Sequence, residues 1–485
     1  ACRPASLRLV FGDRWLADLL AHPGKEHLHG GHLRRILAEK LPFRWQLAQR
    51  GLPGALPHRP EKSTAVHPPV PPKADDWLQP KKVVDLEVTE PVAAQSVGPF
   101  TGLHALVRAA GVPVGTVTLT GQTGPTVSAD KLAIKIQAQL GNALLAALWN
   151  KPARLAAWPP ISVVVCTRDR PAQLANCLAA LQKLDYPQLE IVVVDNAPST
   201  PETAQLVAGL PVRYVREDRP GLDWARNRGL AVAAHDLVAF TDDDACPDQN
   251  WLRGIAAAFA DETITAVTGP VLPQSLDTPA QNLFEFGYGG MSHGFERRVI
   301  RRPQLSNDEL LWASGYGVGA NMALRRSHLA NTGDFDVALD VGTRSGGGGD
   351  VEMFHRVVAR GGTLVYEPTA LVWHQHRPGE EDLRELVQNN GRSFGCYLLT
   401  CARNRTVGRG AIAWFALRHW LWGWLGRRLL RPHGFPRQLV WRELLAALGT
   451  PWRYAQGPRQ AHSVRQQAVS PAAEIGPPVP GPAAS

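Results

Sequence analysis

Three consecutive carboxylates, Asp242, Asp243 and Asp244, follow the apolar run at residues 237–241. Like charges repel one another and lose solvation when they are buried, so an acidic cluster at the end of a buried strand needs a compensating partner. Two carboxylates at positions i and i+2 can both face a divalent cation, and oxygen ligands suit Mg²⁺ or Mn²⁺. The alternative is a solvated acidic turn that binds nothing.

Two other groups of residues have side chains suited to chemistry. Four glycines at 346–349 precede Asp350 at the start of a helical pattern, where an acid can serve as a general base. The alternative is a flexible loop with Asp350 as the helix N-cap. His374 and His376 end an apolar strand, and alternation places both on the same side of it. Either histidine can be a metal ligand, a phosphate partner or a structural residue.

The elements that must position these residues alternate between apolar runs and helical patterns. Predicted strands occupy residues 161–166, 190–196, 212–217 and 237–241, and predicted helices occupy residues 170–184 and 223–235. This order predicts β-α-β units with parallel strands, whose carboxyl ends meet at one edge of a sheet. We therefore expect Thr167, Arg168, Asp195 and the three aspartates along a common edge.

The remainder of the chain differs in composition from this region. We predict the following domains: an N-terminal segment with a Pro-rich linker at 1–79, a small α+β domain at 80–150, the α/β domain at 158–380, a helical basic region at 381–455 and a disordered tail at 456–485. In the small domain, Leu132, Ile136, Leu140 and Leu144 have the spacing of one helix face.

The excess positive charge is concentrated near the C-terminus. The chain of 485 residues has a formal charge of +9, and twelve arginines between 403 and 465 accompany one acid, Glu443. Residues 410–431 are rich in Trp and Arg, which is typical of a helix on an anionic membrane surface, although a helix packed on the catalytic domain is the alternative. No nucleic-acid motif accompanies the arginines, and no apolar run reaches the roughly 20 residues of a spanning helix.

The six cysteines have no regular spacing, and no secretory signal is visible. Reduced thiols are the norm in the cytosol, so we expect a cytoplasmic location, with peripheral contact at the inner face of the membrane.

Seven motifs in order between residues 161 and 377 resemble the family 2 glycosyltransferases. They are VVVCTRDRPAQL, EIVVVDNAPS, RPGLDWARNRGL, FTDDDACPDQNWL, GANMALRRS, GGGGDVEM and VWHQHR. The resemblance implies an α/β fold of the GT-A type, with a nucleotide-sugar-binding domain built on a mostly parallel central sheet. It also implies an inverting, metal-dependent enzyme that moves one sugar from a nucleotide-diphosphate sugar to an acceptor hydroxyl, in the biosynthesis of a cell-surface or secreted glycan.

The resemblance further implies roles for single residues. Thr167, Arg168 and Asp195 are expected to hold the base and ribose, and Arg226 to face the nucleotide or diphosphate. Asp242 and Asp244 would form the DxD element, with Asp243 beside it on the donor. Mn²⁺ or Mg²⁺ would be bound by Asp242, Asp244 and His374, and Asp350 would be the catalytic base.

Two departures from the family pattern matter. Gly349 stands where the family has a glutamate, which makes Glu352 the reserve candidate for the base. The QxxRW element of processive polysaccharide synthases does not follow the histidines, which favours a single-sugar transferase over a polymerase.

Other functions remain open from the sequence. One is a non-catalytic protein that binds a nucleotide sugar or serves as a membrane scaffold. Another is a sugar-1-phosphate nucleotidyltransferase, although the segment CTRDRPAQ lacks the glycine-rich, Arg-Lys-bearing loop that such enzymes need. The acceptor would be a glycan, a lipid-linked molecule or a small molecule, and aromatic residues in 283–298 are expected to contribute to its pocket.

Overall fold

The computed structural model describes residues 78–149, 155, 157–341, 343–430, 434–457, 459, 461, 463 and 464. The predicted Pro-rich segment at 1–79 and the predicted tail at 456–485 lie almost wholly outside the described residues.

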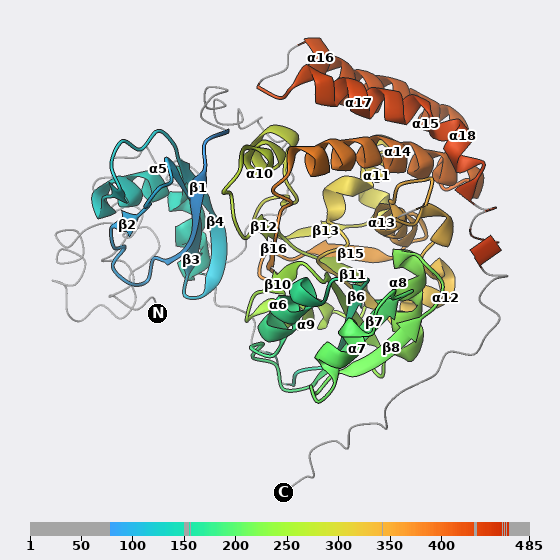
Figure 1. The fold of residues 1–485 in the computed structure, drawn as a ribbon, viewed down its shortest axis with the longest axis horizontal. Coiled ribbons are helices and arrows are strands. Elements are labelled where there is room, and N and C mark those ends of the chain that lie inside the picture. Colours follow the sequence, from blue (N-terminus) through green and yellow to red (C-terminus); the bar gives the residue numbers. More distant parts are fainter. Residues whose placement is uncertain are drawn as a thin grey trace, which may run out of the picture.

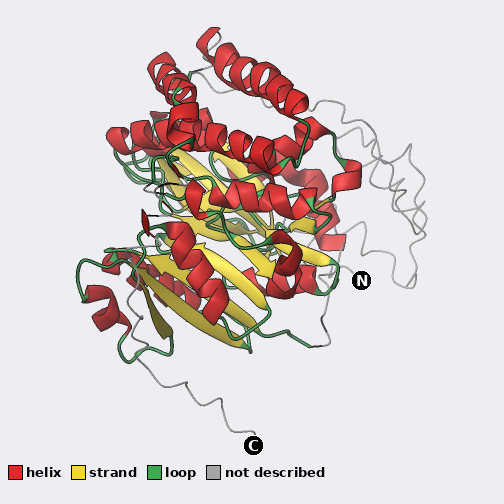
Figure 2. Ribbon diagram, turned by 90° about the vertical axis from the view of Figure 1, so that its right-hand side faces the viewer, coloured by secondary structure: helices red, strands yellow, loops and turns green. Residues whose placement is uncertain are grey.

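An eight-stranded sheet forms the centre of the molecule, in the order β13-β15-β11-β14-β9-β6-β7-β8 (Figures 1 and 2). Six strands run in one direction, and β13 and β14 run against them. The strands are β6 (Ile161–Thr167), β7 (Leu189–Asn196), β8 (Arg213–Glu217), β9 (Leu237–Asp242), β11 (Ile264–Thr268), β13 (Arg298–Ile300), β14 (Met322–Arg325) and β15 (Thr363–Tyr366). The predicted, mostly parallel sheet is confirmed, with its four N-terminal strands close to their expected positions.

Helices cover both faces of this sheet because successive side chains of each strand point to opposite sides. Val163 and Val165 of β6 pack in the same core as α6 (Pro171–Leu181) and α9 (Trp251–Phe259). Val164, between them, belongs to the core on the other face, with α8 (Leu222–Val232) and α13 (Gly349–Ala359). The shorter helices are α7 (Glu202–Val207), α10 (Pro279–Asn282), α11 (Asn307–Leu311), α12 (Leu329–Thr332), η2 (Leu283–Tyr288), η3 (Arg302–Gln304), η4 (Ala313–Tyr316), η5 (Arg326–His328) and η6 (Val337–Leu339).

A second, three-stranded sheet joins segments that are far apart in the chain. Its order is β10-β16-β12, formed by β10 (Ala245–Pro247), β16 (Val372–His374) and β12 (Val271–Pro273). Strands β10 and β16 are antiparallel, and Ala245 is paired with His374. This pairing brings the strand that ends in His374 beside the residue that follows the three aspartates.

The N-terminal part of the described chain forms a separate small sheet with one helix. Strands β1 (Lys81–Glu87), β3 (Gly102–Ala109) and β4 (Val112–Leu119) pair in the order β1-β3-β4, with a small ladder of β2 (Gln95–Ser96) and β5 (Thr126–Val127) beside them. The predicted helix is α5 (Ala129–Trp149), and of its expected apolar face Leu132, Ile136 and Leu144 are buried while Leu140 is partly buried against the same core. Strand β3, which is buried along its whole length, had no alternating pattern by which the sequence could predict it.

Buried polar contacts attach this small sheet to the central domain. The Lys81 ammonium donates to Asn282 Oδ1 at 2.9 Å and lies over the ring of Phe286. Arg108 Nη2 donates to Asp248 Oδ2 at 2.6 Å. Because these groups are removed from solvent, their pairing favours one docked orientation of the two parts.

The C-terminal helices form two layers over the central domain (Figure 1). Helix α14 (Glu380–Asn404) is the inner layer, and α15 (Arg409–Phe415), η7 (Ala416–Gly426), α16 (Arg427–Leu430), α17 (Arg437–Leu448) and α18 (Thr450–Tyr454) make up the outer one. In the outer layer, Phe415, Trp420 and Leu425 are buried in the core. Among the described residues, no helix combines the length and apolar character needed to cross a membrane.

Candidate active site

Three neighbouring strands of the central sheet end side by side. Thr167 of β6 is paired with Asp195 of β7, and Cys166 is paired with Asp242 of β9. Because these strands are parallel, their carboxyl ends lie at the same edge. The sheet thus brings together the residues that the β-α-β pattern predicts there.

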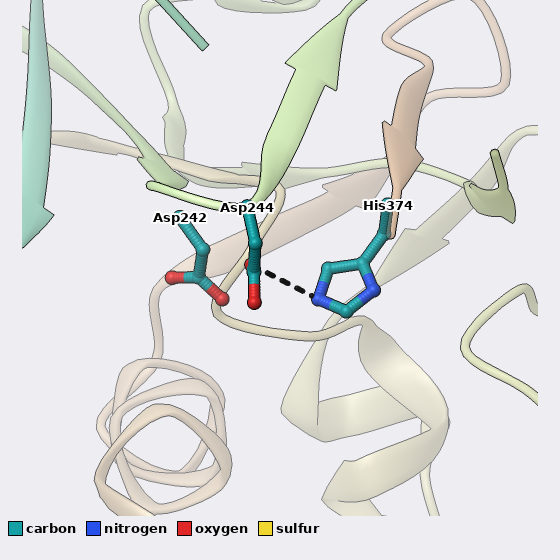
Figure 3. A group of neighbouring side chains, drawn as sticks. All are labelled: Asp242, Asp244 and His374. Atoms are coloured by element: carbon teal, nitrogen blue, oxygen red, sulfur yellow. Dashed lines mark ion pairs between the residues drawn. The ribbon is translucent and has the colours of Figure 1, made fainter. Parts of the chain in front are cut away.

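Asp242, Asp244 and His374 face one another at this edge (Figure 3). Each offers one ligand atom, and these atoms all lie within 4.8 Å of one another. His374 Nε2 lies 3.2 Å from Asp244 Oδ1. Asp243 is separated from this group because its Oδ2 accepts a hydrogen bond from Thr167 Oγ1 at 2.8 Å.

The acidic cluster is partly buried and has cationic neighbours. Burial raises the pKa of Asp242 to about 6, although Arg226 opposes this effect. Burial alone would also raise the pKa of Asp244, but His374 outweighs it, so the pKa of this carboxyl is lowered. For His374, burial opposes the charged form, yet the hydrogen bond and charge of Asp244 raise its pKa. A solvated acidic turn does not describe this arrangement.

The three residues form a group that could hold a metal ion. Carboxylate and imidazole ligands are compatible with divalent transition metals, and carboxylates alone suit Mg²⁺. Ligands at about 2.1 Å from an octahedral ion lie about 3–4 Å from one another, so only small inward movements of the three side chains are needed.

A chain of hydrogen bonds orients His374 from behind. Its Nδ1 lies 3.2 Å from His376 Nδ1, and His376 Nε2 lies 3.0 Å from Glu285 Oε2. If His376 donates from Nε2 to Glu285, its Nδ1 accepts the proton of His374 Nδ1. The neutral form of His374 then presents the lone pair of Nε2 to the cluster, as a metal ligand must.

A cavity of about 460 Å³ opens beside the cluster, within the size range of small-molecule sites. Its walls come from the loop after β6, the acidic cluster, the segment after β16, residues of the predicted acceptor segment and the first turns of α14. The lining residues are Cys166, Thr167, Arg168, Arg170, Asn196, Gly221, Leu222, Asp242, Asp243, Asp244, Ala280, Phe284, Met291, Val341, His374, His376, Arg377, Asp382, Leu383 and Leu386.

The other candidate residues do not line this cavity. Asp195 is fully buried, and its Oδ2 accepts from the Tyr214 hydroxyl at 2.9 Å. Arg226 Nη1 donates to Asp223 Oδ1 at 3.0 Å, inside the protein.

The two candidates for the base have different surroundings. Asp350 is partly exposed at the start of α13, and its Oδ2 accepts from the backbone N–H of Gly319 at 2.8 Å. Glu352, the reserve candidate, is buried and paired with Arg356 at 2.8 Å. Since an acceptor cannot reach a buried, paired carboxylate, the geometry favours Asp350 over Glu352.

Several residues at the site were missed in the sequence. Arg170 Nη1 lies 3.3 Å from Asp243 Oδ1 and 3.5 Å from Asp244 Oδ2. Its position in the motif TRDRP, two residues after Arg168, was the available signal. Glu285 and the α14 residues that line the cavity carry no local signal, because only packing brings them to the site.

Comparisons with known proteins identify the central part of the chain. Residues 162–333 match the profile described as Glycosyl transferase family 2. Residues 162–333 are a family 2 glycosyltransferase domain. The GT-A type fold expected for this glycosyltransferase domain is supported by that match and by its mixed, mostly parallel sheet.

Known relatives align with this chain over part of their length. A pre-mycofactocin glycosyltransferase of Mycobacterium tuberculosis (strain CDC 1551 / Oshkosh) is 27% identical over 221 residues, which are 45% of this chain and 43% of that protein. A hyaluronan synthase of Pasteurella multocida is 27% identical over 248 residues, 46% of this chain and 25% of that protein. The chain thus spans less than half the length of these relatives.

Among solved structures, a mannosyltransferase, PcManGT from Pyrobaculum calidifontis in complex with GDP-Man and Mn²⁺, aligns with a TM-score of 0.39 and 19% identity. The alignment covers 63% of this chain and 91% of that one.

Proposed function

We propose that the protein is a glycosyltransferase that moves one sugar from a nucleotide-diphosphate sugar to an acceptor hydroxyl, in the synthesis of a cell-surface or secreted glycan. The observation that carries this proposal is the Asp242, Asp244 and His374 group beside a cavity at the carboxyl edge of a family 2 glycosyltransferase domain. The acceptor would be a glycan, a lipid-linked molecule or a small molecule.

The donor would lie in the cavity with its diphosphate at the acidic cluster. Thr167 and Arg168 would hold the base and ribose, with Asp243 beside the donor. Asp195, expected to share this role, is buried against Tyr214 and does not line the cavity, so it would support the site from within the sheet. A Mn²⁺ or Mg²⁺ ion held by Asp242, Asp244 and His374 would stabilise the negative charge that develops on the leaving diphosphate. In the structure, Arg226 lies behind the cluster, so its charge would act on the site through Asp242.

Asp350 would act as the general base. It would take the proton of the acceptor hydroxyl while the new bond forms at the anomeric carbon and the bond to the diphosphate breaks. The electron pair of the broken bond leaves with the nucleoside diphosphate. A single displacement of this kind inverts the anomeric configuration.

The first experiment is a panel of UDP-, GDP- and dTDP-sugars, tested for release of nucleoside diphosphate with and without Mn²⁺. Wild type is compared with Asp244→Ala and with Asp350→Asn. We expect metal-dependent release from one donor, loss of metal dependence and rate in Asp244→Ala, and nucleotide binding without transfer in Asp350→Asn.

The main alternative is a protein that binds a nucleotide sugar without turning it over. In that case a binding titration with each nucleotide sugar would detect a complex, but neither wild type nor the variants would release nucleoside diphosphate. If no donor is bound or turned over, both the transferase and the nucleotide-sugar-binding function are excluded, and a membrane scaffold is the remaining hypothesis.

We also propose that the protein is cytoplasmic and rests on the inner face of a membrane through its outer helices. The outer apolar face consists of exposed Trp and Leu side chains on these helices. They are Trp414, Leu417, Trp422, Leu430, Trp441, Leu445, Leu448 and Trp452. The four on α17 and α18 recur at i, i+4, i+7 and i+11, so they form one stripe.

Charge favours an anionic membrane over other partners for this face. Exposed arginines flank it, including Arg418, Arg437 and Arg442. Among the described residues of 405–457, Glu443 is the one acid, and it is buried. Interfacial Trp with flanking arginines suits the boundary between lipid head groups and acyl chains.

Sedimentation with lipid vesicles tests this contact. We expect binding to vesicles that contain phosphatidylglycerol, weaker binding to pure phosphatidylcholine, and loss of binding in Trp441→Ser/Trp452→Ser. Arg437→Gln/Arg442→Gln should weaken binding to the anionic vesicles alone. Ile134→Ser, which removes an exposed apolar side chain from α5, is the matched control and should bind as wild type does. If light scattering instead shows a dimer of the wild type that Trp441→Ser/Trp452→Ser abolishes, a second copy of the chain, and not a membrane, covers the outer apolar face.

A further inference from the structure

Another residue occupies the space that a side chain at position 349 would need. The preceding glycines, Gly346, Gly347 and Gly348, have φ of +81°, +118° and +100°, where residues with a side chain are strained. Gly349 lies outside that region of φ, so its backbone does not require glycine. A Cβ added at Gly349 would lie 1.9 Å from Oδ2 of Asp223, a contact that no real side chain makes.

The carboxylate of Asp223 is held in this position from two directions. Its side chain is almost fully buried, and Oδ1 accepts from Arg226 Nη1 at 3.0 Å. Its backbone N–H donates to Asp340 Oδ2 at 3.0 Å, which anchors the first turn of α8. Within the described part of the chain, Oδ2 has no hydrogen-bond partner. A buried carboxylate with a free oxygen is costly, which suggests a role beyond packing.

Arg226 connects Asp223 to the proposed base. A Cβ added at Gly319 would lie 2.4 Å from Arg226 Nη2 and 2.9 Å from Asp350 Oδ2, so both groups flank the same glycine. The N–H of Gly319 donates to that oxygen of Asp350. One end of the guanidinium is thus paired with Asp223, and the other lies beside the carboxylate of Asp350.

We propose that Asp223 supplies, from helix α8, the carboxylate that position 349 lacks, and that it is a positioning residue which holds Arg226 between Asp350 and the acidic cluster. This inference rests on the proposed function. Without Asp223, the buried guanidinium would shift towards its remaining acidic neighbours, and Asp350 in the first turn of α13 would move with it.

Exchanging the two positions tests the proposal. We expect Asp223→Ala to lower the rate of nucleoside diphosphate release about 10²-fold, as a small misplacement of reacting groups does, while nucleotide binding is kept. Gly349→Glu alone should also lose activity, because its side chain collides with Asp223. The double variant Asp223→Ala/Gly349→Glu should recover most of the rate, since one carboxylate then occupies the shared space.

Glutamine provides the matched control. Asp223→Ala/Gly349→Gln fills the same volume without a carboxylate and should stay as slow as Asp223→Ala. Equal recovery by glutamate and glutamine would overturn the proposal, because volume alone would then explain the site. No recovery in either would overturn it too. If Asp223→Ala does not fold, the activity of the single, isosteric variant Asp223→Asn is measured instead. Full activity of Asp223→Asn would overturn the proposal, because the carboxylate would then be dispensable.

Thermal unfolding separates failure of this inference from failure of the proposed function. If wild type turns over no donor in the panel, the proposed function fails. The Tm values of the variants then test whether the side chains at positions 223 and 349 compete for one space. Gly349→Glu should then lower the Tm by several degrees when Asp223 is present and much less in the Asp223→Ala background. Equal losses in both backgrounds would show that the two positions do not share one space.

Discussion

Replacing Glu443 with glutamine should remove a large pH dependence of stability. Glu443 is a buried residue of the outer helix α17, and its Oε1 accepts from the Tyr288 hydroxyl at 3.0 Å and from Trp424 Nε1 at 2.9 Å. Burial raises its pKa from the usual 4.5 to about 7, although these hydrogen bonds and Arg428 oppose the rise. The folded protein therefore holds a proton on Glu443 that the unfolded chain has lost.

The direction and size of the effect follow from this difference in pKa. Between about pH 4.5 and about pH 7 the folded state binds more protons than the unfolded state, so stability falls as the pH rises through this window. At 1.36 kcal/mol per pKa unit, the full loss is about 3 kcal/mol, and it is complete above about pH 7. Glutamine keeps the accepting oxygen and cannot ionise, so Glu443→Gln should escape the loss.

Urea unfolding of wild type and Glu443→Gln, followed by Trp fluorescence at about pH 4.5 and about pH 8, measures the effect. The stability of the variant relative to wild type should rise by about 3 kcal/mol between the two pH values. Glu385→Gln, which changes an exposed glutamate on α14, should show little change and serves as the control. A difference between Glu443→Gln and wild type that is the same at both pH values would refute the reasoning.

Two further substitutions test the packing that positions the site. Thr167→Val removes the hydroxyl that donates to Asp243 Oδ2, and leaving this carboxylate under-partnered should cost about 1–3 kcal/mol in urea unfolding; an unchanged midpoint would contradict the buried pairing. Gly229→Ala places a Cβ 2.4 Å from Cγ1 of Val164, so it should destabilise by about 1–3 kcal/mol. Its control, Gly141→Ala, fills open space on α5 and should stabilise by up to about 1 kcal/mol; equal effects of the two changes would contradict the close approach of α8 to the sheet.

Much of the central fold could be predicted from the sequence because local patterns record burial. Continuous apolar runs predicted β6, β7 and β9, which helices cover on both faces, and a helical pattern at 170–184 predicted α6. The alternation of side chains along a strand predicted that His374 and His376 lie on one side of it, and their Nδ1 atoms lie 3.2 Å apart. The sequence also predicted that Asp242 and Asp244 share a site.

The rest could not be predicted, because it depends on pairings between distant segments. Strand β3 is buried along its whole length and has little alternation, so its pattern is ambiguous between helix and strand. Strand β10 has three residues, too few for a pattern, yet its pairing with β16 brings His374 beside Asp244.

The sequence by itself determined the chemistry available to this protein: a run of acids after a buried strand, two histidines on one face of another, and a domain of the family 2 glycosyltransferases. Tertiary structure decided which of these groups meet. It put α14 on the wall of the cavity, turned Glu352 into the core with Arg356, and placed the carboxylate of Asp223 where Gly349 has no side chain. The physical reason is that a side chain's type is local information, whereas the space it occupies depends on every element packed around it.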